Sequence, residues 1–139
     1  MTSSGPQAAG RGVEAGPHGD RPSATAPVVA VVKDLFFVAR IRETARLAGV
    51  ALRLARSTEE VEEVDVPAAR LVLLDLTGGF DYDRVFRALA GAPGVAVLGF
   101  TTHALARQTQ PWHSRCRRVI TKETLTQELP ALLRDGLGP

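Results

Sequence analysis

Two apolar runs, PVVAVV at residues 27–32 and RLVLLDL at residues 70–76, constrain the fold more than any other feature of the sequence. Both are rich in valine and leucine, and neither shows the alternation of polar and apolar positions expected of a strand with one solvated face. Uninterrupted apolar strands are typical of a parallel sheet that helices cover on both faces. Neither run approaches the roughly 20 apolar residues of a membrane-spanning helix. The two runs therefore predict central strands of a buried parallel sheet.

Further strand-like and amphipathic segments alternate along the rest of the chain. Strands are predicted at residues 50–55, 94–100 and 117–121, and helices at residues 38–49, 57–64, 82–91, 103–110 and 123–136. Ser57 and Glu60 form a predicted capping box at the start of the second helix. We expect Pro111 to end the fourth helix, with a kink as the alternative, and Pro130 to disturb the fifth.

The repeated order of strand and helix predicts an α/β fold. Short right-handed crossovers between parallel strands leave few topologies for a chain of this size. The prediction is a five-stranded parallel sheet of the flavodoxin-like (βα)5 type, with strand order 2-1-3-4-5 and helices on both faces.

The first 26 residues differ from the rest in composition, because they are rich in Gly, Pro, Ser and Ala and contain one valine and no aromatic residue. Such a segment cannot bury enough apolar surface to offset the entropy lost on ordering. We predict a disordered N-terminal tail at 1–26 and one domain at 27–139. A single cysteine, Cys116, excludes an intrachain disulfide, and the N-terminus has no apolar signal-peptide core, so we expect a cytoplasmic protein without membrane contact.

Polar side chains follow four of the predicted strands at their carboxyl ends, which meet at one edge of a parallel sheet. An aspartate there can accept a phosphoryl group, a second can help to hold Mg²⁺, and a hydroxyl and an ammonium can bind phosphoryl oxygens. The residues are Lys33 and Asp34 after the first strand, Asp75 after the third, Thr101 and Thr102 after the fourth, and Lys122 after the fifth.

In this arrangement the sequence resembles the receiver domain of bacterial response regulators over residues 28–135. The resemblance implies that Asp75 in LVLLDL is the phosphoacceptor and that Asp34 in VVKD is the second acid of the metal-binding pair. It also implies that Lys122 in VITKE is the family's lysine. Thr101 in GFTTH matches the switch Ser or Thr, and Thr102 takes that place if the match shifts by one residue.

Three departures from the family pattern concern the same edge of the sheet. Lys33 stands where the family has its first acid, Gly78 and Gly79 follow where it usually has a proline, and Glu123 replaces the proline that usually follows the lysine. Two alternatives stay open for the Lys33 ammonium, a pair with a nearby carboxylate and a solvated position at the strand end. Mg²⁺ affinity is expected to fall, because Lys33 replaces a negative charge with a positive one. We interpret the chain as an atypical receiver or pseudo-receiver.

The segment QPWHSRCRR, residues 110–118, is a candidate interface. It combines a tryptophan with basic residues, a composition enriched in protein interfaces. The candidate contact residues are Trp112, His113, Arg115 and Arg117. The alternative is that Trp112 packs against its own domain. A pI near 9.2 gives a weak indication of nucleic-acid binding, and no recognised DNA-binding motif supports it.

The leading functional hypothesis is a stand-alone signalling module of the two-component or phosphorelay type. It would not be an enzyme, would need no cofactor, and would contact a kinase or another signalling protein, or a second copy through the face from the fourth to the fifth helix. Phosphorylation at Asp75 would be impaired or absent. One alternative is an active phosphoacceptor that uses Asp34, Asp75 and Lys122 with Mg²⁺. The other is a small flavodoxin-like cofactor-binding protein, although KDLFF lacks the Ser, Thr and Gly donors that cradle a flavin phosphate.

Overall fold

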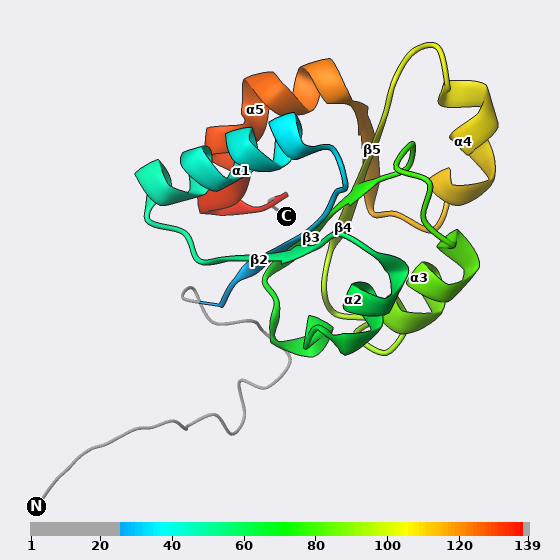
Figure 1. The fold of residues 1–139 in the computed structure, drawn as a ribbon, viewed down its shortest axis with the longest axis horizontal. Coiled ribbons are helices and arrows are strands. Elements are labelled where there is room, and N and C mark those ends of the chain that lie inside the picture. Colours follow the sequence, from blue (N-terminus) through cyan, green and yellow to red (C-terminus); the bar gives the residue numbers. More distant parts are fainter. Residues whose placement is uncertain (1–25, 138–139) are drawn as a thin grey trace, which may run out of the picture.

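Five parallel strands form one sheet in the order β2-β1-β3-β4-β5 in the computed structural model, which describes residues 26–137 (Figure 1). The strands are β1 (Val28–Val31), β2 (Leu52–Ala55), β3 (Leu71–Asp75), β4 (Val97–Thr101) and β5 (Arg118–Thr121). The predicted fold class and strand order are confirmed. Apart from Ala26, the tail predicted at 1–26 lies outside the described residues.

Within residues 26–137, four α-helices and one short 3-10 helix lie between the strands, and a fifth α-helix follows β5. They are α1 (Leu35–Ala48), α2 (Thr58–Glu63), η4 (Val66–Ala68), α3 (Tyr82–Leu89), α4 (Ala106–His113) and α5 (Lys122–Asp135). Helix α1 begins three residues earlier than the pattern predicted, because the Asp34 carboxylate caps it by accepting the N–H groups of Phe36 and Phe37. None of the described helices is long and apolar enough to cross a bilayer.

Proline does not end the fourth helix as predicted. Pro111 lies inside α4, which continues to His113, and Pro130 likewise lies inside α5. A proline in a helix removes one hydrogen bond, so the turn that follows needs another source of stability. For α4 that source is Trp112, whose ring stacks on Phe86 of α3 with centroids 5.7 Å apart. Tertiary packing therefore overrides the local signal of Pro111.

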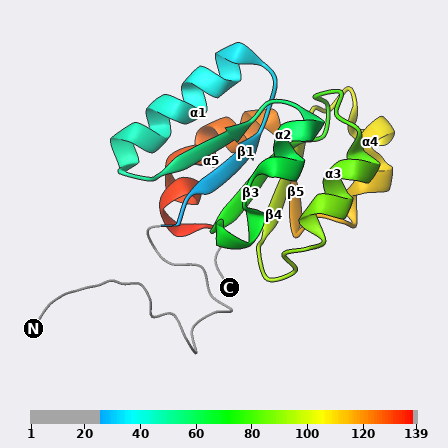
Figure 2. The same ribbon diagram turned by 60° about the horizontal axis from the view of Figure 1, so that its bottom comes forward.

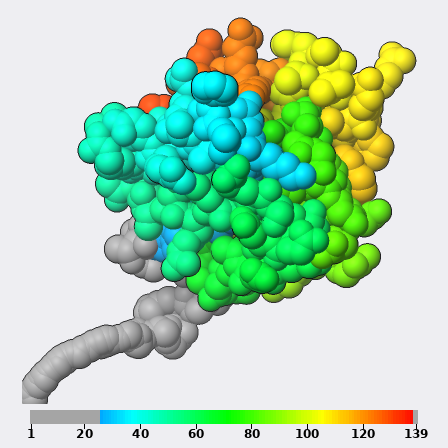
Figure 3. All heavy atoms as spheres, viewed as in Figure 1, coloured from blue at the N-terminus to red at the C-terminus, as the bar shows by residue number. Residues whose placement is uncertain are grey.

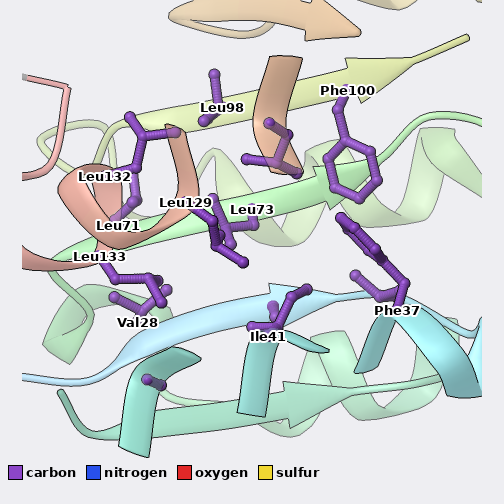
Figure 4. Close-up of a cluster of buried hydrophobic side chains, with 14 of the residues drawn as sticks. Val28, Phe37, Ile41, Leu71, Leu73, Leu98, Phe100, Leu129, Leu132 and Leu133 are labelled. Atoms are coloured by element: carbon purple, nitrogen blue, oxygen red, sulfur yellow. The ribbon is translucent and has the colours of Figure 1, made fainter. Parts of the chain in front are cut away.

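The helices lie in two layers on the faces of the sheet, with α1 and α5 on one face and α2 and α3 on the other (Figures 1 and 2). Alternate residues of β1 divide between the faces, since Val28 and Ala30 join the α1–α5 core and Val29 and Val31 join the other. Figure 4 shows the α1–α5 core, in which the ring of Phe37 meets that of Phe100 at a centroid distance of 5.3 Å. This core fixes the start of α1 beside the end of β4.

Candidate functional site

Asp34 lies at the carboxyl edge of the sheet with both carboxylate oxygens engaged. Oδ1 accepts the N–H groups of Phe36 and Phe37 at 2.9 and 3.2 Å, and Oδ2 accepts the Lys122 ammonium at 3.1 Å. The hydrogen bond from Lys122 and then that from the Phe37 N–H hold the pKa of Asp34 below its usual value. Two residues that the sequence predicted to share a site are thus in direct contact.

Asp75 is buried at the end of β3, and only one of its oxygens has a partner. Its Oδ1 accepts the Thr77 N–H at 2.8 Å and the Thr77 hydroxyl at 2.7 Å. Its Oδ2 accepts no hydrogen bond and makes no ion pair within 4.0 Å among the described residues. The side chain therefore keeps one carboxylate oxygen available, as a nucleophile or metal ligand requires.

Tyr82 fixes the loop after Asp75. Its hydroxyl donates to the Asp75 backbone carbonyl at 2.6 Å and accepts the Gly78 N–H at 2.9 Å. Burial raises the pKa of Tyr82 to about 12, because it disfavours the phenolate. No motif indicated that Tyr82 belongs to this site, and the sequence pattern predicted only that it lies in the third helix. Its role depends on the close return of α3 onto the end of β3.

Lys33 contacts the loop after β3. Its Nζ donates to the Gly79 carbonyl at 3.1 Å and lies 4.7 Å from the Phe80 ring centroid, within cation–π range. Of the two alternatives for Lys33, the pair with a carboxylate is not formed, since Nζ makes no ion pair within 4.0 Å among the described residues. The loop reaches the ammonium because Gly79 has a φ of 76°, which glycine adopts without strain.

The two threonines after β4 have different surroundings. Thr101 is buried, and its hydroxyl lies 3.0 Å from that of Thr109, which in turn lies 2.8 Å from Nε2 of His113. Thr102 accepts the Leu105 N–H at 3.2 Å, a local bond of the turn before α4. Thr101 is therefore tied to α4 by a chain of side chains that the sequence did not reveal.

The described residues do not fit a Mg²⁺ site well. They contain no group of three or more His, Cys, Asp or Glu side chains able to hold a metal ion. Mg²⁺ requires oxygen ligands in near-octahedral geometry. Lys33 occupies the position of the first acid of the expected pair. The second acid, Asp34, already binds Lys122 and the start of α1. Of Asp34 and Asp75, Asp75 alone has an oxygen without a hydrogen bond or ion pair to another described residue.

Beside the Asp34–Lys122 pair is an open groove of about 940 Å³ between α1 and α5. Its walls include Phe37, Arg40 and Thr126. Phe36 also lines it, with 91% of its surface exposed. The groove was not predicted from the sequence, because its walls come from segments that are distant in the chain.

The predicted interface segment packs partly against its own domain. Trp112 is half-buried and lies 5.7 Å from the ring of Tyr82 as well as from that of Phe86. The alternative in which Trp112 covers its own domain thus describes its contacts. Arg115 lies over the Phe86 ring at 4.8 Å, and Arg117 is exposed. Docking of a partner on this segment stays a prediction.

No family model matches the sequence, and no curated protein matches it. Solved receiver domains share its fold. A response regulator receiver domain protein from Clostridium thermocellum has a TM-score of 0.65 and 14% identity, over 81% of this chain and 94% of that one. The receiver domain of NtrX from Brucella abortus has a TM-score of 0.64 and 16% identity, over 79% and 97%. The match to a longer NtrX chain, with a TM-score of 0.64 and 15% identity, covers 80% of this chain and 27% of that one. The chain therefore has the receiver fold.

Proposed function

We propose that this chain is a receiver-like signalling module that acts through protein–protein contacts, has no enzymatic activity, and is phosphorylated at Asp75 poorly or not at all. The receiver fold supports the assignment to signalling. The observation that carries the second part is the state of Asp34, because its two oxygens are divided between the α1 cap and Lys122.

Electrostatics explain why this arrangement disfavours phosphoryl transfer. A phosphoryl group that approaches Asp75 brings negative charge to a carboxylate, and a bound cation normally offsets that charge. To ligate Mg²⁺, Asp34 would have to release the Lys122 ammonium or weaken the α1 cap. Lys33 adds a second ammonium where an acid would attract the metal. Both effects reduce the affinity for Mg²⁺.

An active phosphoacceptor is the second candidate, and one observation favours it. Among the described residues, no hydrogen-bond or ion-pair partner of the Oδ2 of buried Asp75 competes with its attack on phosphorus. In that step a new Oδ2–P bond forms, the P–O bond to the donor breaks, and the donor's leaving oxygen takes the electron pair. This candidate differs from the first in rate and in dependence on Mg²⁺.

A flavin-binding role receives no support from the loop after β1. The backbone N–H groups at the start of α1 are taken by the Asp34 carboxylate, so they do not form a phosphate cradle. We therefore do not propose a cofactor.

The experiment is a calorimetric Mg²⁺ titration of the wild type, Lys33→Met and Lys33→Asp. Methionine removes the charge at nearly constant length, and aspartate also supplies the missing acid. Affinity is expected to rise from the wild type through the methionine variant to the aspartate variant, by about tenfold at the last step. Wild-type affinity equal to that of Lys33→Asp would contradict the proposal, since Lys33 would then not weaken the site.

A further inference from the structure

The net positive charge of this chain is concentrated in one stretch. Residues 84–122 contain seven Lys or Arg residues and no Asp or Glu. Because the whole chain has a net charge of +2, the remaining residues together carry −5. The stretch forms most of α3, then β4, α4 and β5 (Figures 1 and 2).

Part of this charge is neutralised within the fold. Arg84 pairs with Glu62 at 2.6 Å, Arg118 with Glu128 at 3.6 Å, and Lys122 with Asp34 at 3.1 Å. Arg87 acts on Glu62 from a longer distance and lowers the pKa of that carboxyl, after the larger effect of Arg84. These cations have internal roles and are not available to a partner in full.

Two exposed arginines on the loop between α4 and β5 have no such partner. Arg115 and Arg117 make no ion pair within 4.0 Å with any described carboxylate. The loop is fixed at both ends, because the Arg115 N–H donates to the Trp112 carbonyl and the Arg117 N–H to the Val97 carbonyl. The two guanidinium groups therefore extend from a well-defined backbone.

A series of aromatic rings packs against Arg115 of this loop. Tyr82, Trp112 and Phe86 form a continuous series with centroid distances of 5.7 Å, and the Arg115 guanidinium lies 4.8 Å above Phe86. Such packing restricts the rotamers of Arg115 before any partner arrives, which lowers the entropy cost of binding. In the space-filling view, α4 forms the yellow end of the visible face (Figure 3).

We propose that the α4–β5 loop docks an acidic segment of a protein partner through Arg115, which packs on the aromatic series, and the exposed Arg117. The proposal rests on the proposed function, since it names the chemistry of the partner that the signalling module contacts. Paired carboxylates would meet the two guanidinium groups, whose planar forks bind carboxylates in two-point geometry. The absence of Asp and Glu from residues 84–122 limits repulsion against such a partner.

A protein is favoured over a nucleic acid by the size and chemistry of the surface. Nucleic-acid binding draws on several phosphate contacts along a groove or stripe, whereas two unpaired arginines share this loop. Single-stranded binding also uses aromatic rings on which bases stack, but here the ring of Trp112 is occupied by Tyr82 and Phe86.

The test measures fluorescence anisotropy of a labelled glutamate-rich peptide with the full chain at low ionic strength. The comparison ligands are the same peptide with glutamine for glutamate and a single-stranded DNA of equal charge. The wild type should bind the glutamate peptide more tightly than either. No binding of the glutamate peptide, or tighter binding of the DNA, would overturn the proposal.

Variants localise the binding. Arg115→Gln/Arg117→Gln should weaken it by about tenfold, whereas Arg42→Gln/Arg53→Gln removes equal charge from exposed, unpaired positions on α1 and β2 and should change it far less. Equal losses would show a general charge effect and overturn the assignment. Because Arg115 packs on Phe86, Arg117→Gln alone is the second variant, with an expected loss of about threefold.

The outcome is independent of phosphorylation. If the wild type neither binds the glutamate peptide nor is phosphorylated at Asp75, the docking proposal is rejected and the proposed function is not. Peptide binding together with efficient phosphorylation would reject only the impaired chemistry.

Discussion

At the residue scale, Lys33 and Asp34 are neighbours in the chain whose side chains stabilise different elements. Lys33 holds the loop after β3 through the Gly79 carbonyl, and Asp34 holds the start of α1 and the start of α5. Residues at the place of the family's acidic pair thus make structural contacts here. The Lys33 ammonium, which we propose weakens metal binding, also holds the loop after β3.

Tyr82 gives a prediction for alkaline pH. Its pKa is about 12 in the folded chain, above its value of 10.0 in the unfolded chain. A raised pKa contributes stability that is complete below pH 10.0 and is lost as the pH rises through about 12. The chain has one tyrosine, so ultraviolet absorbance of the phenolate follows this group alone. A midpoint near 10.0 in the native protein would contradict the burial of its hydroxyl.

Cys116 gives a second prediction at this scale. Burial raises the pKa of its thiol to about 11, so little thiolate forms at neutral pH. A thiol reagent should label the native chain at least about tenfold more slowly than the urea-unfolded chain, because only the thiolate reacts. Mass spectrometry over time measures both rates on the single cysteine. Equal rates would mean that the packing of Cys116 against Gly99 does not persist in solution.

At the scale of elements, the sequence correctly predicted the cap at the start of α2, but it wrongly predicted the end of α4. The Ser57 cap is as predicted, with its hydroxyl accepting the Glu60 N–H at 3.1 Å. The reciprocal bond goes instead from the Arg56 N–H to Glu60, one residue before the expected donor. The predicted end of the fourth helix at Pro111 was wrong, because local propensity does not include the packing of Trp112 on α3.

Removing the cap of α2 should have a measurable cost. Ser57→Ala leaves the Glu60 N–H without its acceptor, and we expect a loss of about 1 kcal/mol in the free energy of unfolding. Ser57→Asp keeps an acceptor and serves as the control, with little loss expected. Urea denaturation measures both, and equal destabilisation by the two variants would exclude capping as the cause.

At the scale of the whole molecule, stability rests on the two cores that flank the sheet. Leu73 is fully buried on central strand β3, whereas 71% of Leu47 on α1 is exposed. Leu73→Ala should cost about 2–5 kcal/mol, a large part of the roughly 5–15 kcal/mol typical of a domain. Leu47→Ala should change stability by less than about 0.5 kcal/mol. Thermal unfolding compares them, and similar losses would contradict the described core.

The global fold was predictable because apolar strands and amphipathic helices alternate with short connections. The convergence of Asp34 and Lys122 followed from that topology, and they lie 3.1 Å apart. Individual contacts were not predictable, since they depend on rotamers and on loops such as Gly78–Gly79. Lys33 therefore donates to a backbone carbonyl and not to a carboxylate. Tyr82 and Thr109 contact site residues because α3 and α4 pack against the ends of β3 and β4.

The claim most open to a direct test is our proposal that Asp75 is phosphorylated poorly or not at all. The most direct measurement is the intact mass of the chain after incubation with acetyl phosphate and Mg²⁺, with Asp75→Asn treated in parallel. We predict no phosphorylated species in the wild type, or only a trace that does not depend on Mg²⁺. A Mg²⁺-dependent gain of one phosphoryl group in most of the wild type, absent in Asp75→Asn, would contradict the claim.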